Sequence, residues 1–138
     1  MTRRNGFTLV ELVVVILILG ILAGVAAPKM FSTSAKATDN GLRQTLAVVR
    51  DAIELYVAQE GVPPTCTGTG SDVRALLKPY LRGPFPTSPV GTQDFDIKPV
   101  TVTTADDSTG WMYNTNTGEF IANCTDASPT DGTVFSAY

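Results

Sequence analysis

Residues 3–29 of the chain read RRNGFTLVELVVVILILGILAGVAAPK. Between Phe7 and Ala27 it contains one charged residue, Glu11. About 20 apolar residues are enough for a helix to cross a bilayer, so this stretch predicts a membrane-spanning helix. Arg3 and Arg4 precede it. By the positive-inside rule they place the N-terminus in the cytoplasm and the rest of the chain on the other side of the membrane.

A cleaved secretory signal and an uncleaved signal anchor are two ordinary interpretations of such a segment. A secretory signal has a basic start, an apolar stretch of about 7–15 residues and a small-x-small cleavage site. Here the apolar stretch is longer, and AGVAAPK (residues 23–29) is a poor site. Neither interpretation explains Glu11, because an acidic residue within a helix in lipid costs roughly 3 kcal/mol on insertion scales. A cost of that size is usually offset by a partner, and neither interpretation supplies one.

The residues GFTLVELVVVILILGILAGVAAPK (6–29) resemble the N-terminal signature of type IV pilins and type II secretion pseudopilins. In that family a short basic leader ends in Gly and is followed by Phe, a nearby Glu and an apolar helix with a Pro near its far end. The matching residues here are Gly6, Phe7, Glu11 and Pro28. The resemblance implies that a prepilin peptidase cleaves between Gly6 and Phe7 and that the new Phe7 amine is N-methylated. It also implies that Glu11 pairs with the amine of a neighbouring subunit during filament assembly.

The pattern beyond the apolar stretch predicts that the helix continues. Pro28 has no N–H and its ring presses on the carbonyl of Gly24, so we expect a kink between Gly24 and Pro28. Apolar residues then recur at spacings of three and four, which is typical of an amphipathic helix: Leu42, Leu46, Val49, Ile53 and Tyr56. Gly61, followed by two prolines, predicts the helix end. One helix over residues 7–60 follows, although a break into two helices at Gly41 stays open.

The remaining residues predict a small head. SDVRALLKPYL (71–81) favours a short helix near 73–77 capped by Ser71 or Asp72, PVTVTT (99–104) favours a strand, and GWMYNTNTGEFIANC (110–124) favours a hairpin. The fold class is therefore α+β and pilin-like, with a long N-terminal helix packed on a small antiparallel sheet. Four segments are expected: a leader (1–6), a transmembrane and assembly helix (7–28), an amphipathic extension (29–61) and the head (62–138).

Cys66 and Cys124 are the only cysteines of the chain. Both follow the membrane segment, where an oxidising environment lets disulfides persist, so we predict a bond between them. Free thiols and part of a metal site are the competing interpretations. Major pseudopilins commonly carry an acidic calcium loop near the C-terminus, whereas this chain offers only Asp126 and Asp131 there. A hard cation takes six or more oxygens, so these two carboxylates support calcium only weakly, and calcium stays an open alternative. We expect no other metal and no cofactor.

The amino-acid composition argues against two classes of function, catalysis and nucleic-acid binding. The chain contains no His, which removes the commonest general base, and no convergent catalytic set is evident, so we expect no enzyme. Ten Lys and Arg against 13 Asp and Glu give a net charge of −3, which argues against nucleic acid as a partner.

The resemblance implies a bacterial inner-membrane protein with a single span, its head in the periplasm, that self-assembles into an extracytoplasmic filament. Its expected partners are the prepilin peptidase, other pilins or pseudopilins and the inner-membrane assembly platform. A pseudopilin of type II secretion is the leading hypothesis. A type IV pilin for adhesion, motility or DNA uptake and a membrane-anchored binding module are the alternatives.

Overall fold

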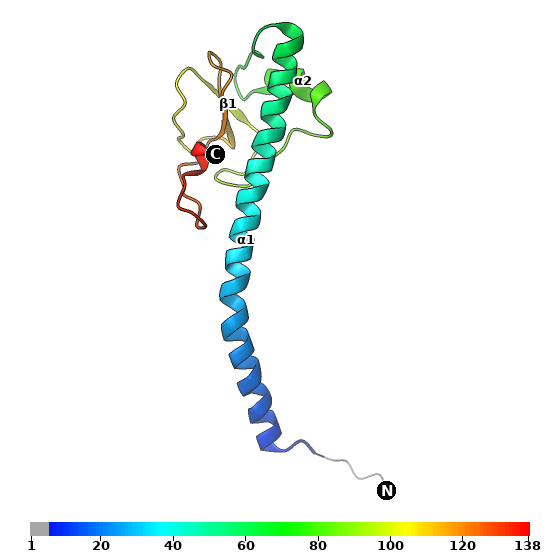
Figure 1. Ribbon diagram of the computed structural model, residues 1–138, viewed down its shortest axis with the longest axis vertical. Helices are drawn as coiled ribbons and strands as arrows, with labels where there is room; N and C mark the ends of the chain where they lie inside the picture. Colours follow the sequence, from blue (N-terminus) through cyan, green and yellow to red (C-terminus); the bar gives the residue numbers. More distant parts are fainter. Residues whose placement is uncertain (1–5) are drawn as a thin grey trace. The chain divides into compact units, whose positions relative to one another are not determined.

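The computed structural model describes residues 6–138 of the chain. The predicted leader therefore lies outside the described residues except for Gly6, as do Arg3 and Arg4. In chain order the elements are two helices, a 3-10 turn, three strands and a second 3-10 turn (Figure 1): α1 (Leu9–Glu60), α2 (Ser71–Leu77), η1 (Lys78–Tyr80), β1 (Ile97–Val100), β2 (Trp111–Asn114), β3 (Phe120–Ala122) and η2 (Phe135–Ala137). The chain divides into two compact units, Met1–Ser34 and Ala35–Tyr138, and α1 contributes to both.

Helix α1 continues without a break through Pro28 and Gly41. The alternative of two helices separated at Gly41 is therefore wrong. Proline has no N–H to donate to the carbonyl four residues earlier, and we therefore still predict a bend near Gly24 and Pro28. The helix ends where the sequence predicts, at Gly61, whose φ of 75° is left-handed and whose N–H donates to the carbonyl of Val57 at 2.8 Å. A left-handed glycine that bonds back to the last turn is a common helix C-terminus.

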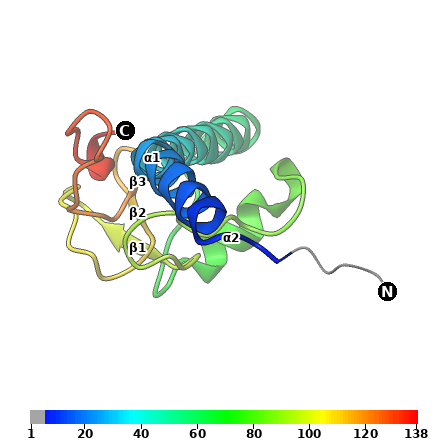
Figure 2. The same ribbon diagram turned by 90° about the horizontal axis from the view of Figure 1, so that it is seen from below.

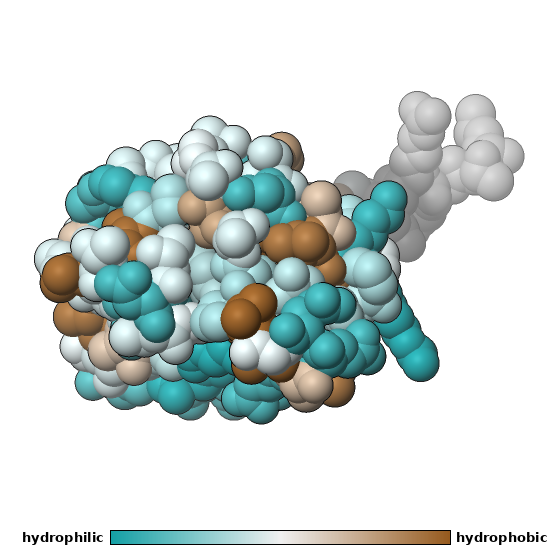
Figure 3. Space-filling view, turned by 90° about the horizontal axis from the view of Figure 1, so that it is seen from above, coloured by the Kyte–Doolittle hydropathy of each residue, from teal (hydrophilic) through white to brown (hydrophobic). Residues whose placement is uncertain are grey.

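The core of the unit Ala35–Tyr138 forms where the predicted apolar stripe of α1 meets the sheet and α2. Leu42 and Val49 are completely buried, and Tyr56 packs against the core from its edge. The largest buried side chains of the sheet are Trp111, Tyr113 and Phe120. In Figures 1 and 2, α2 lies on one side of α1, whereas the C-terminal segment lies on the other. Seen from above, the surface of this unit is a mixture of polar and apolar residues (Figure 3).

The sheet has the strand order β1-β2-β3 and is mixed, not antiparallel as predicted. β2 and β3 form the expected antiparallel hairpin, with Trp111 opposite Ala122. β1 runs parallel to β2, with Ile97 opposite Trp111. The reason is that residues 101–110 return along the sheet before β2 begins. The predicted strand is also displaced, because β1 ends at Val100 and Val102 is 74% exposed.

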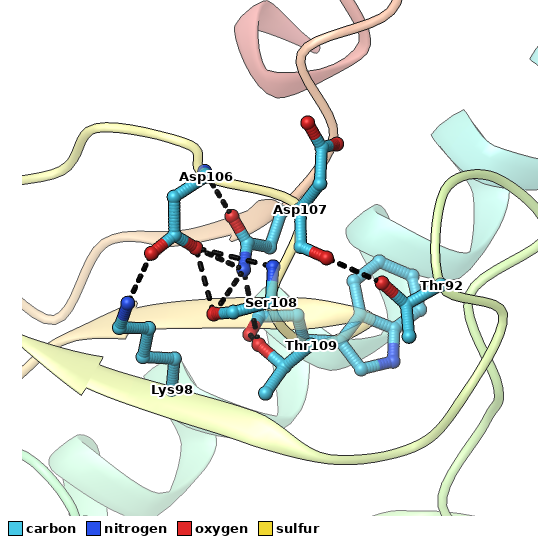
Figure 4. A network of polar contacts seen from close by, with 8 residues as sticks. Thr92, Lys98, Asp106, Asp107, Ser108 and Thr109 are labelled. Carbon is cyan, nitrogen blue, oxygen red and sulfur yellow. Dashed lines mark hydrogen bonds and ion pairs between the residues drawn. The ribbon is translucent and has the colours of Figure 1, made fainter.

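Polar contacts hold the returning loop, residues 101–110, in place (Figure 4). Asp106 pairs with Lys98 of β1 and also accepts hydrogen bonds from the Asn123 amide at 2.9 Å and the Ser108 hydroxyl at 2.7 Å. These partners, Lys98 first, hold the pKa of the Asp106 carboxyl well below its usual range. At the end of the loop, the N–H of Gly110 donates to Asp94 Oδ1 at 2.6 Å.

Helix α2 begins two residues earlier than predicted and without the predicted cap. Its N-cap is Gly70, in the left-handed region, and no side chain caps the helix. The carboxylate of Asp72 instead accepts hydrogen bonds from the N–H and the hydroxyl of Thr67. A Cβ added at Gly70 would lie 2.5 Å from Cβ of Ile97, so glycine here allows the loop to approach β1. Tertiary packing, which the local pattern did not reveal, determined this helix start.

The predicted disulfide is not formed: Cys66 and Cys124 are both free and buried. Cys66 lies beside Val100 and Thr115, where β1 and β2 end. Cys124 follows β3, and because β3 is antiparallel to β2 it lies near the start of β2. The first and last Cα atoms of β2 are about 10 Å apart at roughly 3.3 Å per residue, whereas a disulfide needs Cα atoms within about 7 Å. The sheet therefore keeps the two thiols apart, and burial raises the pKa of Cys66 to about 11.

Candidate assembly site

The first part of α1 has no packing partner within its own unit. Every residue from Gly6 to Ser34 is exposed, including Phe7 at 84%. Among the described residues, α1 is the one helix long and apolar enough to cross a membrane, with a mean hydropathy of 2.9 over its best window. Leaving so much apolar surface in water is strongly unfavourable, so lipid or other protein must cover it.

Glu11 is held by Thr8 at the N-terminus of this helix. The N–H and the hydroxyl of Thr8 both donate to Glu11 Oε2, at 2.8 and 2.9 Å. In return the N–H of Glu11 donates to the Thr8 hydroxyl at 3.2 Å. This reciprocal arrangement is a capping box, which satisfies N–H groups that the first turn of a helix leaves unpaired. The T-x-x-E spacing that predicts it was present in the sequence and was overlooked.

The capping box leaves one carboxylate oxygen of Glu11 available. Oε2 accepts both hydrogen bonds from Thr8, whereas Oε1 accepts none from residues 6–138. Glu11 lies in the first turn of α1, and Gly6 and Phe7 lie just before the helix. A carboxylate fixed in this way can accept a positive group at its second oxygen, since a carboxylate has about four acceptor positions.

Gly20 and Gly24 leave two positions without a side chain on the apolar surface of α1. A Cβ added at Gly20 or Gly24 would meet no other atom within 4 Å, so packing inside this chain does not require glycine there. Gly20 lies in a shallow groove of about 480 Å³ whose other lining residues are Val13, Ile16, Leu17 and Ile21. Small residues allow the backbones of two helices to approach closely in a membrane.

The acidic residues near the C-terminus do not fit a calcium site. Asp131 pairs with Arg43 at 3.3 Å and accepts hydrogen bonds from the N–H of Thr133 and the hydroxyl of Tyr138. These bonds, with the Thr133 N–H as the largest cause, hold the pKa of Asp131 below its usual range. Across residues 6–138, no group of three or more His, Cys, Asp or Glu side chains is placed to hold a metal ion.

Comparison with known proteins finds a family model that matches the N-terminal segment of the chain. The family model described as the prokaryotic N-terminal methylation motif matches residues 1–27. This chain carries the prepilin-type methylation motif. The match covers the predicted cleavage position, the Thr8–Glu11 capping box and the glycine-containing apolar surface of α1.

The relatives of this motif-bearing chain are components of bacterial filaments and of secretion systems. It is 35% identical over 86 residues to the type II secretion system core protein G of Aeromonas hydrophila, covering 62% of this chain and 58% of that protein. It is 39% identical over 64 residues to the type IV narrow pilus major component PilA5 of Thermus thermophilus, covering 46% and 55%. It is 41% identical over 79 residues to the fimbrial protein EcpB of Eikenella corrodens, covering 55% and 50%.

The chain spans about half the length of these curated relatives. No solved structure matches it.

Proposed function

We propose that this chain is a structural, non-enzymatic subunit that polymerises through α1 into a type IV-like filament, as a pseudopilin of a type II secretion system. The observation that carries the proposal is the exposed apolar surface of residues 6–34 with Glu11 fixed in its first turn. A helix of this kind is stable in a bilayer and, after leaving it, in a bundle of identical helices. The similarity to the core protein G of several bacteria supports the assignment to secretion.

A type IV pilus is the second candidate filament. The similarity to PilA5 and EcpB supports it. Both candidates use the same surface of α1 and differ in the machine that assembles the filament. Deleting the gene and measuring protein secretion, surface pili and twitching motility separates them, since a pseudopilin mutant loses secretion and keeps its pili.

In this proposal, a prepilin peptidase cleaves between Gly6 and Phe7 on the cytoplasmic face of the membrane, and the Phe7 amine is N-methylated. The chain then spans the inner membrane once, with residues 62–138 in the periplasm, until the assembly platform and other pilins incorporate it. The new amine is a positive group, and Glu11 of a neighbouring copy pairs with it through the free Oε1. Pairing removes the cost of a lone carboxylate in apolar surroundings, so it favours one axial register.

The N-terminal mass of chain recovered from membranes tests the processing step. We expect a chain that begins at Phe7 with one added methyl group. An intact Met1, or a cleavage near Ala27, contradicts the proposal.

Replacing Glu11 tests the assembly step. We expect Glu11→Ala to insert in the membrane as well as the unchanged chain and to lose most filament formation, because the amine of the next subunit then lacks its counter-charge. Filament yield measured by shearing and sedimentation reports the result. A Glu11→Ala chain that polymerises normally removes the role assigned to the carboxylate.

A further inference from the structure

The two flanks of the unit Ala35–Tyr138 offer complementary charges. α2 and η1 lie on one side of α1 and the C-terminal segment on the other, in both ribbon views (Figures 1 and 2). On the α2 flank, Lys78 and Arg82 are exposed and form no ion pair with any of residues 6–138. On the other flank, Asp126 is exposed and also lacks an ion pair among those residues.

The α2 flank contains a groove with a fixed aromatic wall, which we call the α2 groove. It encloses about 380 Å³, and its lining is mainly apolar: Ala75, Leu81, Gly83, Pro84, Phe85 and Phe95, with Arg74 and Lys78. The Arg74 guanidinium pairs with Asp96 at 2.7 Å and lies over the Phe95 ring at 4.7 Å from its centroid. Arg74 is therefore already occupied, whereas Lys78 leaves an uncompensated positive charge at an aromatic groove.

The opposite flank presents a loop of defined shape, residues 126–134, which we call the C-terminal loop. Its two ends meet in a bridge between Ala127 and Val134, and the N–H of Ser128 donates to the carbonyl of Thr133 at 2.8 Å. The hydroxyl of Ser128 donates to the buried Asp39 of α1 at 2.6 Å, which anchors the loop. These bonds already order the loop, so binding costs little further conformational entropy. Pro129 and Thr130 remain exposed.

We propose that the α2 groove binds the C-terminal loop of a second copy of this chain, with Asp126 facing Lys78 and Pro129 against Phe85 and Phe95. The inference rests on the proposed function and names the contact between heads that accompanies the helix contact. Aromatic grooves are well suited to bind proline, and opposite charges across an interface set its register. Each copy carries both the groove and the loop, so the contact is heterologous and repeats from copy to copy. An unclosed contact of this kind builds a filament.

Cysteine cross-linking in the full-length chain in its own membrane tests the contact. Ala75→Cys places a thiol in the groove, and Thr130→Cys places one at the tip of the loop. Oxidation of a chain carrying both changes is expected to give a ladder of covalent multimers. The matched control combines Ala75→Cys with Glu60→Cys, an exposed position at the end of α1, and is expected to give no ladder. The native thiols Cys66 and Cys124 are buried and do not take part.

Charge reversal then tests the pairing. In the cross-linking chain, Lys78→Glu and Asp126→Lys are each expected to reduce the ladder at least five-fold, and together they are expected to restore it. Lys36→Glu makes the same charge change on α1 outside both surfaces and is expected to leave the ladder unchanged. Recovery in the double reversal also shows that the single variants fold.

The outcomes separate the inference from the function on which it rests. Equal ladders from both cysteine pairs, a ladder insensitive to Lys78→Glu, or cross-links to a different protein overturn the contact, while filaments still form. If the unchanged chain forms no filament and does not begin at Phe7, the proposed function itself is wrong.

Discussion

Thr8 is the residue that the structure adds to the candidate assembly site. Its hydroxyl both donates to Glu11 and accepts from the Glu11 N–H, so it fixes the carboxylate relative to the start of α1. Without it, the carboxylate keeps its charge but loses its orientation, and the first helical turn loses a cap. Capping residues typically contribute about 1 kcal/mol to helix stability.

We therefore expect Thr8→Val to slow filament formation several-fold without abolishing it, whereas Thr8→Ser keeps the hydroxyl and assembles at the normal rate. The yield of sheared filaments over time after induction measures the difference. The Glu11→Ala chain is the reference for the larger loss of filaments. If Thr8→Val and Thr8→Ser assemble alike, the hydroxyl has no part in positioning Glu11.

The two cysteines give a second prediction at the residue scale. Both thiols are buried, and burial raises their pKa, so the reactive thiolate is scarce as well as inaccessible in the folded chain. We expect a thiol reagent at pH 8 to label no cysteine in the folded protein and two in the protein unfolded in guanidinium without a reductant. Labelling of none after unfolding would show that a disulfide exists.

At the scale of elements, the apolar part of α1 contains glycine where its own chain gives no reason for it. Gly20→Leu places a bulky side chain in the groove beside Val13 and Leu17, and nothing within the chain obstructs it. Leucine has a high helix propensity and a favourable free energy of membrane insertion, so the folding of α1 and its insertion in the membrane should be unaffected. We expect the filament yield to fall by more than half, because a neighbouring helix can no longer approach. As a control, cleavage between Gly6 and Phe7 should remain complete in this variant, as measured by the mass of the N-terminus.

The returning loop 101–110 is held in place by a carboxylate that acid neutralises. The pKa of Asp106 is lowered in the folded state, mainly by Lys98, so the folded state favours the ionised carboxylate. Its stabilisation is present above the unfolded pKa of about 3.9 and is lost as the pH falls below it. We expect the thermal midpoint to fall between pH 5 and pH 2. Asp106→Asn should lower the midpoint at pH 7 and reduce its dependence on pH; an unchanged dependence contradicts this assignment.

The elements differ in how far the sequence predicted them. α1, its end at Gly61 and the hairpin of β2 and β3 follow from local patterns of apolar residues, glycine and proline, and the structure confirms all three. The parallel pairing of β1 with β2 depends on contacts between residues distant in sequence, among them Asp106 with Asn123. The separation of Cys66 from Cys124 depends on that same sheet. Neither could be predicted from spacing alone.

The candidate functional residues also differ in whether a local sequence pattern could predict them. Gly6, Phe7 and Glu11 lie within six residues of one another, so a local motif was enough to predict a role for them, and the methylation motif that matches residues 1–27 contains all three. The sequence did not predict the α2 groove or the C-terminal loop. Lys78 and Phe95 meet in the groove only after the head has folded, and folding places Asp126 in the loop on the other flank. Their charges are visible in the sequence, but their placement on opposite flanks is not.

At the scale of the whole molecule, the buried core and the exposed apolar surface of α1 fall in different units. The buried residues belong to the unit Ala35–Tyr138, whereas residues 6–34 are exposed throughout. The second unit buries its own apolar residues and needs nothing from the first to do so. Folding and polymerisation should therefore be separable.

We expect a chain that begins at Ala35 to be water-soluble, monomeric at micromolar concentration and cooperatively folded, because the whole core is retained and the apolar surface of α1 is gone. The contact between the α2 groove and the C-terminal loop alone is too small to hold a dimer at that concentration, since stable interfaces bury about 1,200–2,000 Å². Size-exclusion chromatography and a thermal melt measure both properties. Leu46→Ala, which leaves a cavity in the core, is the control: it should lower the free energy of unfolding by about 2–5 kcal/mol and lower the thermal midpoint with it. An unfolded or aggregated Ala35–Tyr138 chain would mean that residues 6–34 also support the head, and then the loss of filaments in the α1 variants would no longer report assembly alone.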